Sequence, residues 1–254
     1  MSTSSTLTPN DLILDCEEIY DPLQQSIWCF KHVDDIVEGI TLNLCNMTSC
    51  YPFEIEGVGW RSSEELYLAG EFSNDSAEHL AIQNELKAAK SLYAAKRFVK
   101  GKHRKEVRND FCEFRTQWML WCVWQKCRGN ADFRSKLLSV PEDVTLVEET
   151  TTDTGSSGQV WGCSNRELVE VRKRLAQSII ENNSNLSKRE LAHRLNVETN
   201  ASRNVGLFRG CNNIGKILMI CRECILRQTE PDIDHDLLRL KNIYLLGKLL
   251  TFND

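Results

Sequence analysis

The stretch Phe111–Cys127 constrains the fold more than any other part of this chain. Large apolar side chains lie on every side of the helix that it would form: Phe114, Trp118, Met119, Trp121, Val123 and Trp124. A helix that is apolar all round is enclosed by other elements, whereas a surface helix is apolar on one face only. The spacing therefore predicts a central core helix over 111–127.

The composition is that of an ordinary globular protein. The chain has 254 residues, of which 41% are hydrophobic and 26% charged, so bulk disorder is excluded. A chain of this length forms one large or two small domains, and its core needs no disulfide or metal. The formal net charge of −5 excludes a uniformly basic coat for nucleic acid, but leaves a local basic patch open.

We expect a cytoplasmic protein without a membrane segment. The sequence contains no run of about 18 apolar residues, and its first residues lack the basic and apolar regions of a secretory signal. The eleven cysteines are odd in number, so we expect reduced, mostly buried thiols and no disulfide framework. We also expect no cofactor, and no metal centre, because no two Cys-x-x-Cys motifs occur at zinc spacing.

The periodicity predicts a mainly α fold with a few short β-strands. Residues 53–60 alternate between apolar and polar up to a glycine, which indicates a short strand and a turn. Ser62 and Glu65 form a capping box that opens a helix, and Ser187 and Glu190 form a second one. Apolar residues at helical spacing predict further helices over 77–98, 165–181, 187–196, 214–227 and 236–250.

A basic run lies between Lys87 and Arg108. It holds nine Lys or Arg and a single acid, Glu106. Such a run can bind a diphosphate or a nucleic-acid backbone, or it can be a solvated helix face. Both interpretations are open at this point.

Four separated blocks carry a further pattern. They are Leu44–Met47 with Glu54–Glu64, Arg108–Phe111 with Met119 and Lys126, Leu146–Glu148 with Asp153 and Val160–Gly162, and Gly210–Met219. Their order and approximate spacing over 44–222 resemble those of the NADAR family. The resemblance implies a helix-rich fold, an ADP-ribose or ribose-phosphate ligand, and hydrolysis of an N-glycosidic bond. The substrate would be a riboflavin-pathway intermediate or ADP-ribosylated guanine in nucleic acid.

The resemblance also implies the site residues. It gives catalytic roles to Glu64, Glu148 and Asp153, and ligand-binding roles to Asn46, Trp60, Arg108, Lys126, Trp161, Gly210, Asn212 and Lys216. A carboxylate suits this chemistry, because breaking a C–N glycosidic bond builds positive charge on the sugar. Glu64 would lie in the first turn of a helix, where the helix dipole favours an ionised acid.

Several of these residues also have a structural interpretation. Glu64 could be a helix-capping acid, Asp153 a turn residue and Glu148 the partner of a nearby base. Trp161 could stack on a base or lie in a core. The segment Gly210–Lys216 could bind phosphate at a helix N-terminus or be an ordinary glycine–asparagine loop.

Three features depart from the family pattern. Glu65, Leu68 and Glu71 stand where the family commonly has histidine, glutamine and lysine. The loop of the third block is longer, and 47 residues separate Gly162 from Gly210. We therefore expect an acidic N-terminal segment (1–40), a NADAR-like domain (41–230) with a helical insertion (163–209), and a helical C-terminal tail (231–254).

Three functions are compatible with the sequence. The first is a hydrolase that removes ADP-ribose from guanine in DNA or RNA, as the antitoxin to an ADP-ribosyltransferase toxin. Its partners would be ADP-ribose or an ADP-ribosylated guanine nucleotide, single-stranded nucleic acid and the toxin, with no membrane. The second is an N-glycosidase on a phosphorylated riboflavin-pathway intermediate, which the basic run favours less. The third is a non-catalytic ADP-ribose-binding module, suggested by Glu71 in place of the family lysine.

Overall fold

The computed structural model describes residues 12–31, 35–150, 160–201 and 205–252. The chain divides into two compact units, each made of two segments. The sheet unit consists of Met1–Leu42 and Val140–Met219, and the helical unit of Asn43–Ser139 and Ile220–Asp254. Helix α8 (Asn213–Arg227) begins in the sheet unit and ends in the helical unit.

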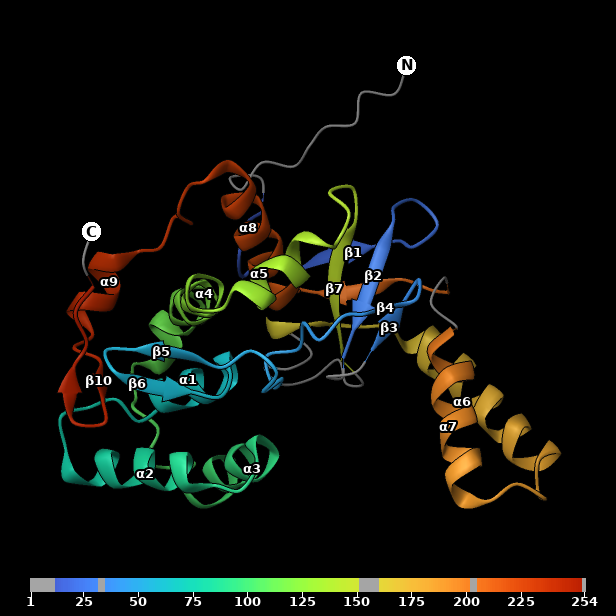
Figure 1. Ribbon diagram of the computed structural model, residues 1–254, viewed down its shortest axis with the longest axis horizontal. Helices are drawn as coiled ribbons and strands as arrows, with labels where there is room; N and C mark the ends of the chain where they lie inside the picture. Colours follow the sequence, from blue (N-terminus) through green and yellow to red (C-terminus); the bar gives the residue numbers. More distant parts are fainter. Residues whose placement is uncertain (1–11, 32–34, 151–159, 202–204, 253–254) are drawn as a thin grey trace. The chain divides into compact units, whose positions relative to one another are not determined.

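The sheet unit contains a five-stranded mixed sheet (Figure 1). Its strands, in spatial order, are β1 (Glu18–Tyr20), β9 (Phe208–Gly210), β8 (Cys163–Ser164), β7 (Thr145–Thr150) and β2 (Ile27–Phe30). Strand β7 runs parallel to both β2 and β8, whereas β9 is antiparallel to both β8 and β1. A small hairpin of β3 (Ile36–Val37) and β4 (Ile40–Thr41) belongs to the same unit.

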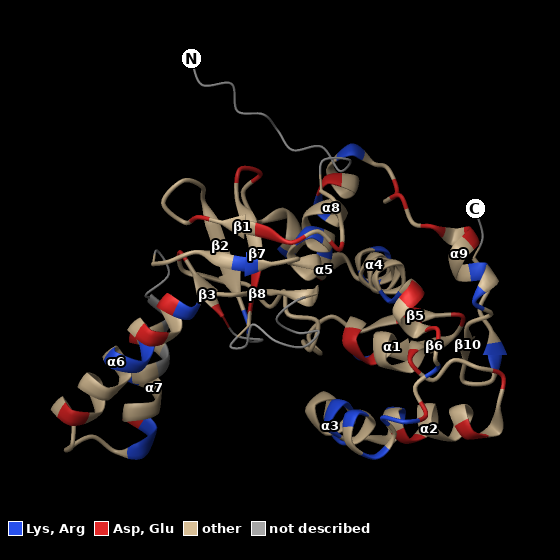
Figure 2. Cartoon of the chain, turned by 180° about the vertical axis from the view of Figure 1, so that it is seen from behind, with Lys and Arg blue, Asp and Glu red and all other residues tan. Residues whose placement is uncertain are grey.

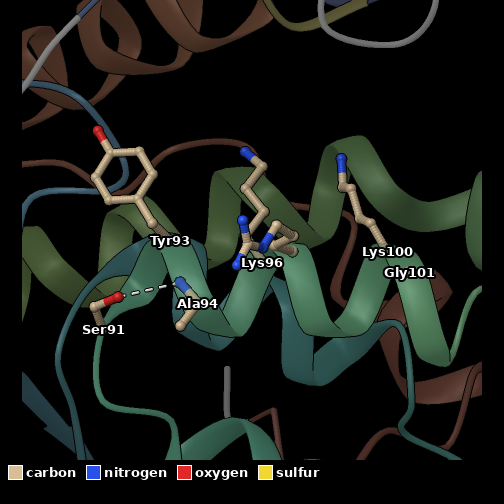
Figure 3. A pocket seen from close by; sticks show the side chains of 7 residues that line it. Ser91, Tyr93, Ala94, Lys96, Lys100 and Gly101 are labelled. Atoms are coloured by element: carbon tan, nitrogen blue, oxygen red, sulfur yellow. Dashed lines mark hydrogen bonds between the residues drawn. The ribbon is translucent and has the colours of Figure 1, made fainter.

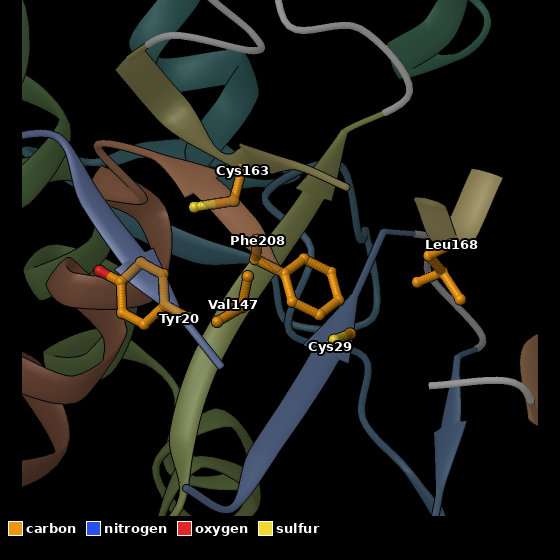
Figure 4. Close-up of a cluster of buried hydrophobic side chains, with 6 residues drawn as sticks. All are labelled: Tyr20, Cys29, Val147, Cys163, Leu168 and Phe208. Carbon is orange, nitrogen blue, oxygen red and sulfur yellow. The ribbon is translucent and has the colours of Figure 1, made fainter. Parts of the chain in front are cut away.

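Side chains from all five of these strands form a buried cluster with the first turn of α6 (Figure 4). The cluster consists of Tyr20, Cys29, Val147, Cys163, Leu168 and Phe208. Each strand supplies one of these side chains, and Leu168 comes from α6. The sheet is therefore assembled from segments that are far apart in the chain.

The prediction of a mainly α fold is wrong. The structure is 49% helical and 14% strand, and its five-stranded mixed sheet makes it an α/β fold. The physical reason lies in strands such as β2 and β7, whose apolar residues are consecutive instead of alternating, as in Trp28-Cys29-Phe30. Parallel strands are buried on both faces, so they lack the period-two pattern that marks a strand in sequence.

The segment between β8 and β9 is a pair of helices, as the sequence predicts. Helix α6 (Arg166–Asn182) is capped by Asn165, and helix α7 (Lys188–Ala201) packs beside it. Ser187 and Glu190 exchange hydrogen bonds of 3.0 and 3.3 Å between backbone amides and side chains, which confirms this capping box. Arg172 of α6 pairs with Glu149 of β7 at 2.5 Å and ties the helices to the sheet.

The helical unit holds most of the helices and two hairpins. The helices are α1 (Ser63–Gly70), α2 (Ala77–Ala88), α3 (Leu92–Lys102), α4 (Phe111–Gly129), α5 (Ala131–Leu138) and α9 (His235–Leu240). The hairpins are β5 (Phe53–Ile55) with β6 (Val58–Trp60), and β10 (Tyr244–Leu245) with β11 (Lys248–Leu249). The strand and turn predicted over 53–60 are therefore confirmed.

Helix α4 is the central core helix that the sequence predicts. Its Trp118 is fully buried and stacks on Trp121 with ring centroids 4.9 Å apart. The Trp118 indole N–H donates a 3.2 Å hydrogen bond to the carbonyl of Tyr67 on α1. The two helices approach so closely that a Cβ at Gly70 would lie 2.1 Å from the Trp118 indole nitrogen. Only glycine fits at that crossing.

Two predicted helices have different bounds in the structure. The stretch 77–98 is two helices, α2 and α3, because Ser91 caps a new helix by accepting a 3.1 Å hydrogen bond from the Ala94 amide. The stretch 236–250 is helical only up to Leu240. Positive φ angles at Leu246 and Gly247 form the turn of the β10–β11 hairpin there instead.

All eleven cysteines are free thiols, and seven of them are buried, as expected. Within the described ranges no helix is long and apolar enough to cross a membrane. In the same ranges no group of three or more His, Cys, Asp or Glu side chains could hold a metal ion.

The helix crossing predicts opposite effects for two glycine substitutions. Gly70→Ala should lower the free energy of unfolding by about 1–3 kcal/mol, because the new methyl group overlaps the buried indole of Trp118. Gly101→Ala on α3 is the control, since a Cβ there meets nothing within 4 Å, and it should leave stability unchanged or raise it by up to about 1 kcal/mol. Urea unfolding of both variants measures this. Equal stabilities would show that the crossing relaxes freely.

Candidate functional site

The first turn of α1 follows directly from strand β6. Ser62 caps the helix by accepting a 3.1 Å hydrogen bond from the Glu65 amide. The Glu65 carboxylate accepts a 2.7 Å hydrogen bond from the Arg61 amide and pairs with Lys87 at 3.3 Å. Glu65 therefore performs the capping role that was one interpretation of Glu64. The neighbouring acid, Glu64, is available for another role.

Glu64 is buried, with 6% of its surface exposed. Contacts of both its backbone and its side chain hold it in place. Its backbone amide donates a 3.2 Å hydrogen bond to the Asn46 carbonyl. The Asn46 side chain accepts a 3.0 Å hydrogen bond from the Ser63 hydroxyl. On the side-chain end, Lys96 of α3 forms a 2.5 Å ion pair with the Glu64 carboxylate. The structure thus brings together two residues of the predicted site, Asn46 and Glu64.

Lys96 also lines an open pocket of about 720 Å³ on α3 (Figure 3). The lining residues are Ser91, Tyr93, Ala94, Lys96, Arg97, Lys100 and Gly101. Tyr93, Lys96 and Lys100 are three and four residues apart, and their side chains extend on the same side of the helix in Figure 3. We call this the α3 pocket.

The α3 pocket has the chemistry of a site for a phosphorylated aromatic ligand. Three of its lining side chains are cations, and it lies in the basic run 87–108; Figure 2 shows Lys and Arg along α3. Lysine and arginine are the side chains that bind phosphate through charge-assisted hydrogen bonds. Tyr93 is 64% exposed, so its ring is accessible for stacking on a base.

A second acid, Glu71 at the C-cap of α1, lies close to the same cations. Glu71 is buried, and burial raises the pKa of its carboxyl to about 7. The positive charges of Lys100 and Lys96 oppose this rise, whereas the negative charge of Glu64 adds to it. In the sequence, Glu71 stands out as a departure from the family pattern and not as a predicted site residue. Its spacing of seven residues from Glu64, on the same side of a helix, was the signal that could have identified it.

The other predicted residues of the helical unit have mainly internal contacts. Trp60 is buried beneath the Lys87 ammonium, which lies 4.4 Å from the ring centroid. Arg108 is buried, and its guanidinium donates to the Asp110 carboxylate at 2.7 and 3.0 Å. The same group donates to the Ser73 hydroxyl at 2.9 Å and the Lys241 carbonyl at 2.7 Å.

Lys126 differs from Trp60 and Arg108 in its contacts. Its side chain is completely buried on α4, and its ammonium has no hydrogen-bond partner among the described residues. The nitrogen lies 3.9 Å from the centroid of the Phe133 ring. Burial lowers the pKa of the amine to about 8, although the nearby thiols of Cys127, Cys45 and Cys221 oppose the shift.

In the sheet unit, Asn212 and Lys216 hold the start of α8 in place. The buried Asn212 side chain accepts a 3.0 Å hydrogen bond from the Glu148 amide and donates one of 2.8 Å to the Leu146 carbonyl. The buried Lys216 ammonium donates to the Ile13 and Cys16 carbonyls at 2.8 and 3.0 Å and pairs with a carboxylate of the same N-terminal segment. Both groups are occupied within the chain.

Four further predicted residues lie in the sheet unit. Gly210 ends strand β9 opposite Glu18, and the Glu148 side chain is half-buried on β7. Trp161 is half-buried immediately before β8, while Asp153 lies outside the described residues. The predicted site residues therefore form two groups. One group, which includes Asn46 and Glu64, belongs to the helical unit, and the other, which includes Glu148 and Asn212, belongs to the sheet unit.

The chain was compared with protein families, curated proteins and solved structures. A scan against protein-family models finds no match, and a search of curated proteins finds none either. Among solved structures, the chain is similar to the NMR structure of the E. coli protein YbiA, at probability 1.00 and a TM-score of 0.48. The two share 20% identity, over 80% of this chain and 87% of that chain. Family membership stays a prediction from the four motifs.

The buried amine of Lys126 predicts a pH-dependent stability. Its pKa is about 8 in the folded protein and near 10.5 when exposed, so the unfolded state binds more protons between these values. Stability should therefore rise with pH from about 8 to 10.5. Lys126→Met should be about 1–3 kcal/mol more stable than wild type at pH 7, with a smaller difference at pH 10.

Urea unfolding at pH 7 and pH 10 measures this difference. Lys90→Met, at an exposed position of the same unit, is the control and should change little at either pH. A loss of stability in Lys126→Met at both pH values would show instead that the ammonium makes a favourable contact.

Proposed function

We propose that this protein hydrolyses an N-glycosidic bond at Glu64, with the substrate held in the α3 pocket. The substrate is an ADP-ribosylated guanine nucleotide in DNA or RNA. The observation that carries the proposal is the 2.5 Å ion pair between the buried Glu64 carboxylate and Lys96, a side chain that lines the pocket. A sugar bound against Lys96 lies within reach of this carboxylate.

The geometry of Glu64 fits the electrostatic demand of the reaction. Breaking the bond between the sugar C1 and the base nitrogen gives the sugar oxocarbenium character in the transition state. A carboxylate that is already fixed and desolvated stabilises this charge without reorganising. Glu64 lies in the first turn of α1, and its carboxylate pairs with the Lys96 ammonium at 2.5 Å.

The α3 pocket supplies the binding chemistry. Lys96, Arg97 and Lys100 match the two phosphates of ADP-ribose, and the exposed ring of Tyr93 offers a surface for a purine. The basic run continues on both sides of the pocket, which favours a single-stranded polyanion over a small metabolite. Reversal of such a modification would make the protein the antitoxin to an ADP-ribosyltransferase toxin.

The proposal predicts a loss of turnover in Glu64→Gln without a loss of binding. The substitution retains the shape of the side chain but removes its charge, so kcat on an ADP-ribosylated guanine oligonucleotide should fall about 10²–10³-fold. The Kd for ADP-ribose, measured by calorimetry, should stay within about threefold, since the lost interaction is made chiefly in the transition state. The matched control is Glu85→Gln, an exposed acid in the same unit, which should retain wild-type values.

Other outcomes assign the protein differently. Turnover of a phosphorylated riboflavin-pathway intermediate, with none of the oligonucleotide, would identify a metabolite N-glycosidase. Binding of ADP-ribose without turnover of either substrate would identify a binding module. Wild-type turnover by Glu64→Gln would make Glu64 a structural residue.

A further inference from the structure

Glu64 and Glu71 occupy the same side of helix α1. They are seven residues apart, which is two helical turns or about 10 Å along the axis. Helix α3 packs on α1 and brings Lys96 and Lys100, which are one turn apart, to the two acids. Lys96 pairs directly with Glu64, whereas Lys100 contributes the largest opposing charge at Glu71. Both lysines line the α3 pocket.

The two acids have different surroundings. Glu64 has a direct cationic partner at 2.5 Å. In the part of the chain that the structure describes, the Glu71 carboxylate accepts no hydrogen bond, and it is buried. Burial raises its pKa to about 7, so it retains its proton up to neutral pH while an ordinary glutamate does not.

Charged and titratable groups approach this helix from α2, α3 and α4. They are Lys96 and Lys100 on α3, Glu64 and Tyr67 on α1, Arg115 on α4, His79 on α2, and Arg108 before α4. Among the groups that act on Glu71, only the lysines favour its ionised form. Arg108 contacts Glu71 through its backbone amide, and its guanidinium pairs with Asp110.

We propose that Glu71 is the general acid of the site, which protonates the departing base while Glu64 stabilises the sugar. This inference rests on the function proposed above. In this chain Glu71 supplies a catalytic carboxyl at the position where the family commonly has lysine. Two carboxyl groups in different environments on one helix face suit a division of labour between acid and stabiliser.

The step balances as a hydrolysis. The bond between the sugar C1 and the base nitrogen breaks, its electron pair goes to the nitrogen, and the Glu71 proton is transferred to the base. A water oxygen then bonds to C1, and Glu64 takes up the proton that the water loses. The products are the free base and a sugar with a hydroxyl at C1. Proton exchange with solvent returns both acids to their starting states.

Leaving-group dependence provides the test. One substrate is the ADP-ribosylated guanine oligonucleotide, whose base needs a proton to depart. The other is the 4-nitrophenyl glycoside of ADP-ribose, whose leaving group departs without one. Glu71→Gln should lower kcat/KM on the first substrate by about 10²–10⁴-fold and on the second by less than about fivefold. Glu64→Gln should turn over both substrates slowly. Glu85→Gln should turn over both at the wild-type rate.

The pH profile is the second measurement. For the wild type on the guanine substrate, kcat/KM should fall as pH rises through about 7, because Glu71 then loses its proton. Glu71→Gln should lack this alkaline fall. Glu71→Asp, which keeps a carboxyl, should retain it at a reduced rate. Melting temperatures of all variants identify any that fail to fold, and Glu71→Asp replaces Glu71→Gln in that case.

Two results would overturn the inference while leaving the proposed function intact. The first is a Glu71→Gln enzyme with the wild-type rate and pH profile on guanine. The second is an equal loss on both substrates, which would make Glu71 a structural residue. A wild-type protein that turns over neither substrate would instead overturn the proposed function, and this inference with it.

Discussion

The helical unit depends on the close crossing of helices α1 and α4. Gly70 lets the α1 backbone rest against the Trp118 indole, whose N–H donates to the Tyr67 carbonyl. Every residue of α1 is buried, including Glu64 and Glu65, and so is Glu71 at the C-cap of the helix. Burying a carboxylate is unfavourable unless it is paired or protonated. Because of the crossing, these buried carboxyl groups need either a cationic partner or a bound proton.

The three glutamates, Glu64, Glu65 and Glu71, differ in their partners. Glu65 caps the helix and pairs with Arg61 and Lys87. Glu64 pairs with Lys96 at the wall of the α3 pocket. Glu71 has no direct partner among the described residues, and its pKa rises. One short helix and its C-cap therefore hold an acid paired with two cations, an acid paired with a pocket lysine and an acid whose pKa is raised by burial.

Two buried lysines show a similar contrast. The Lys216 ammonium has carbonyl partners from the N-terminal segment, so it holds that segment to α8 in the sheet unit. The Lys126 ammonium has only an aromatic ring and thiols near it, and its pKa falls. Sequence reasoning treated both as ligand-binding candidates. Only the structure shows that one is fully occupied within the chain and the other has no hydrogen-bond partner among the described residues.

Local patterns in the sequence were sufficient for the central helix, the β5–β6 hairpin, the capping boxes and the paired helices α6 and α7, since each depends on neighbouring residues. The sheet could not be predicted in this way, because its strands are two to six residues long and come from four distant segments. The sequence also placed Glu64 at the start of a helix. Its burial, its pairing with Lys96 and the altered proton affinity of Glu71 were decided only when α3 packed on α1, because desolvation and charge pairing arise between elements that are not neighbours in sequence.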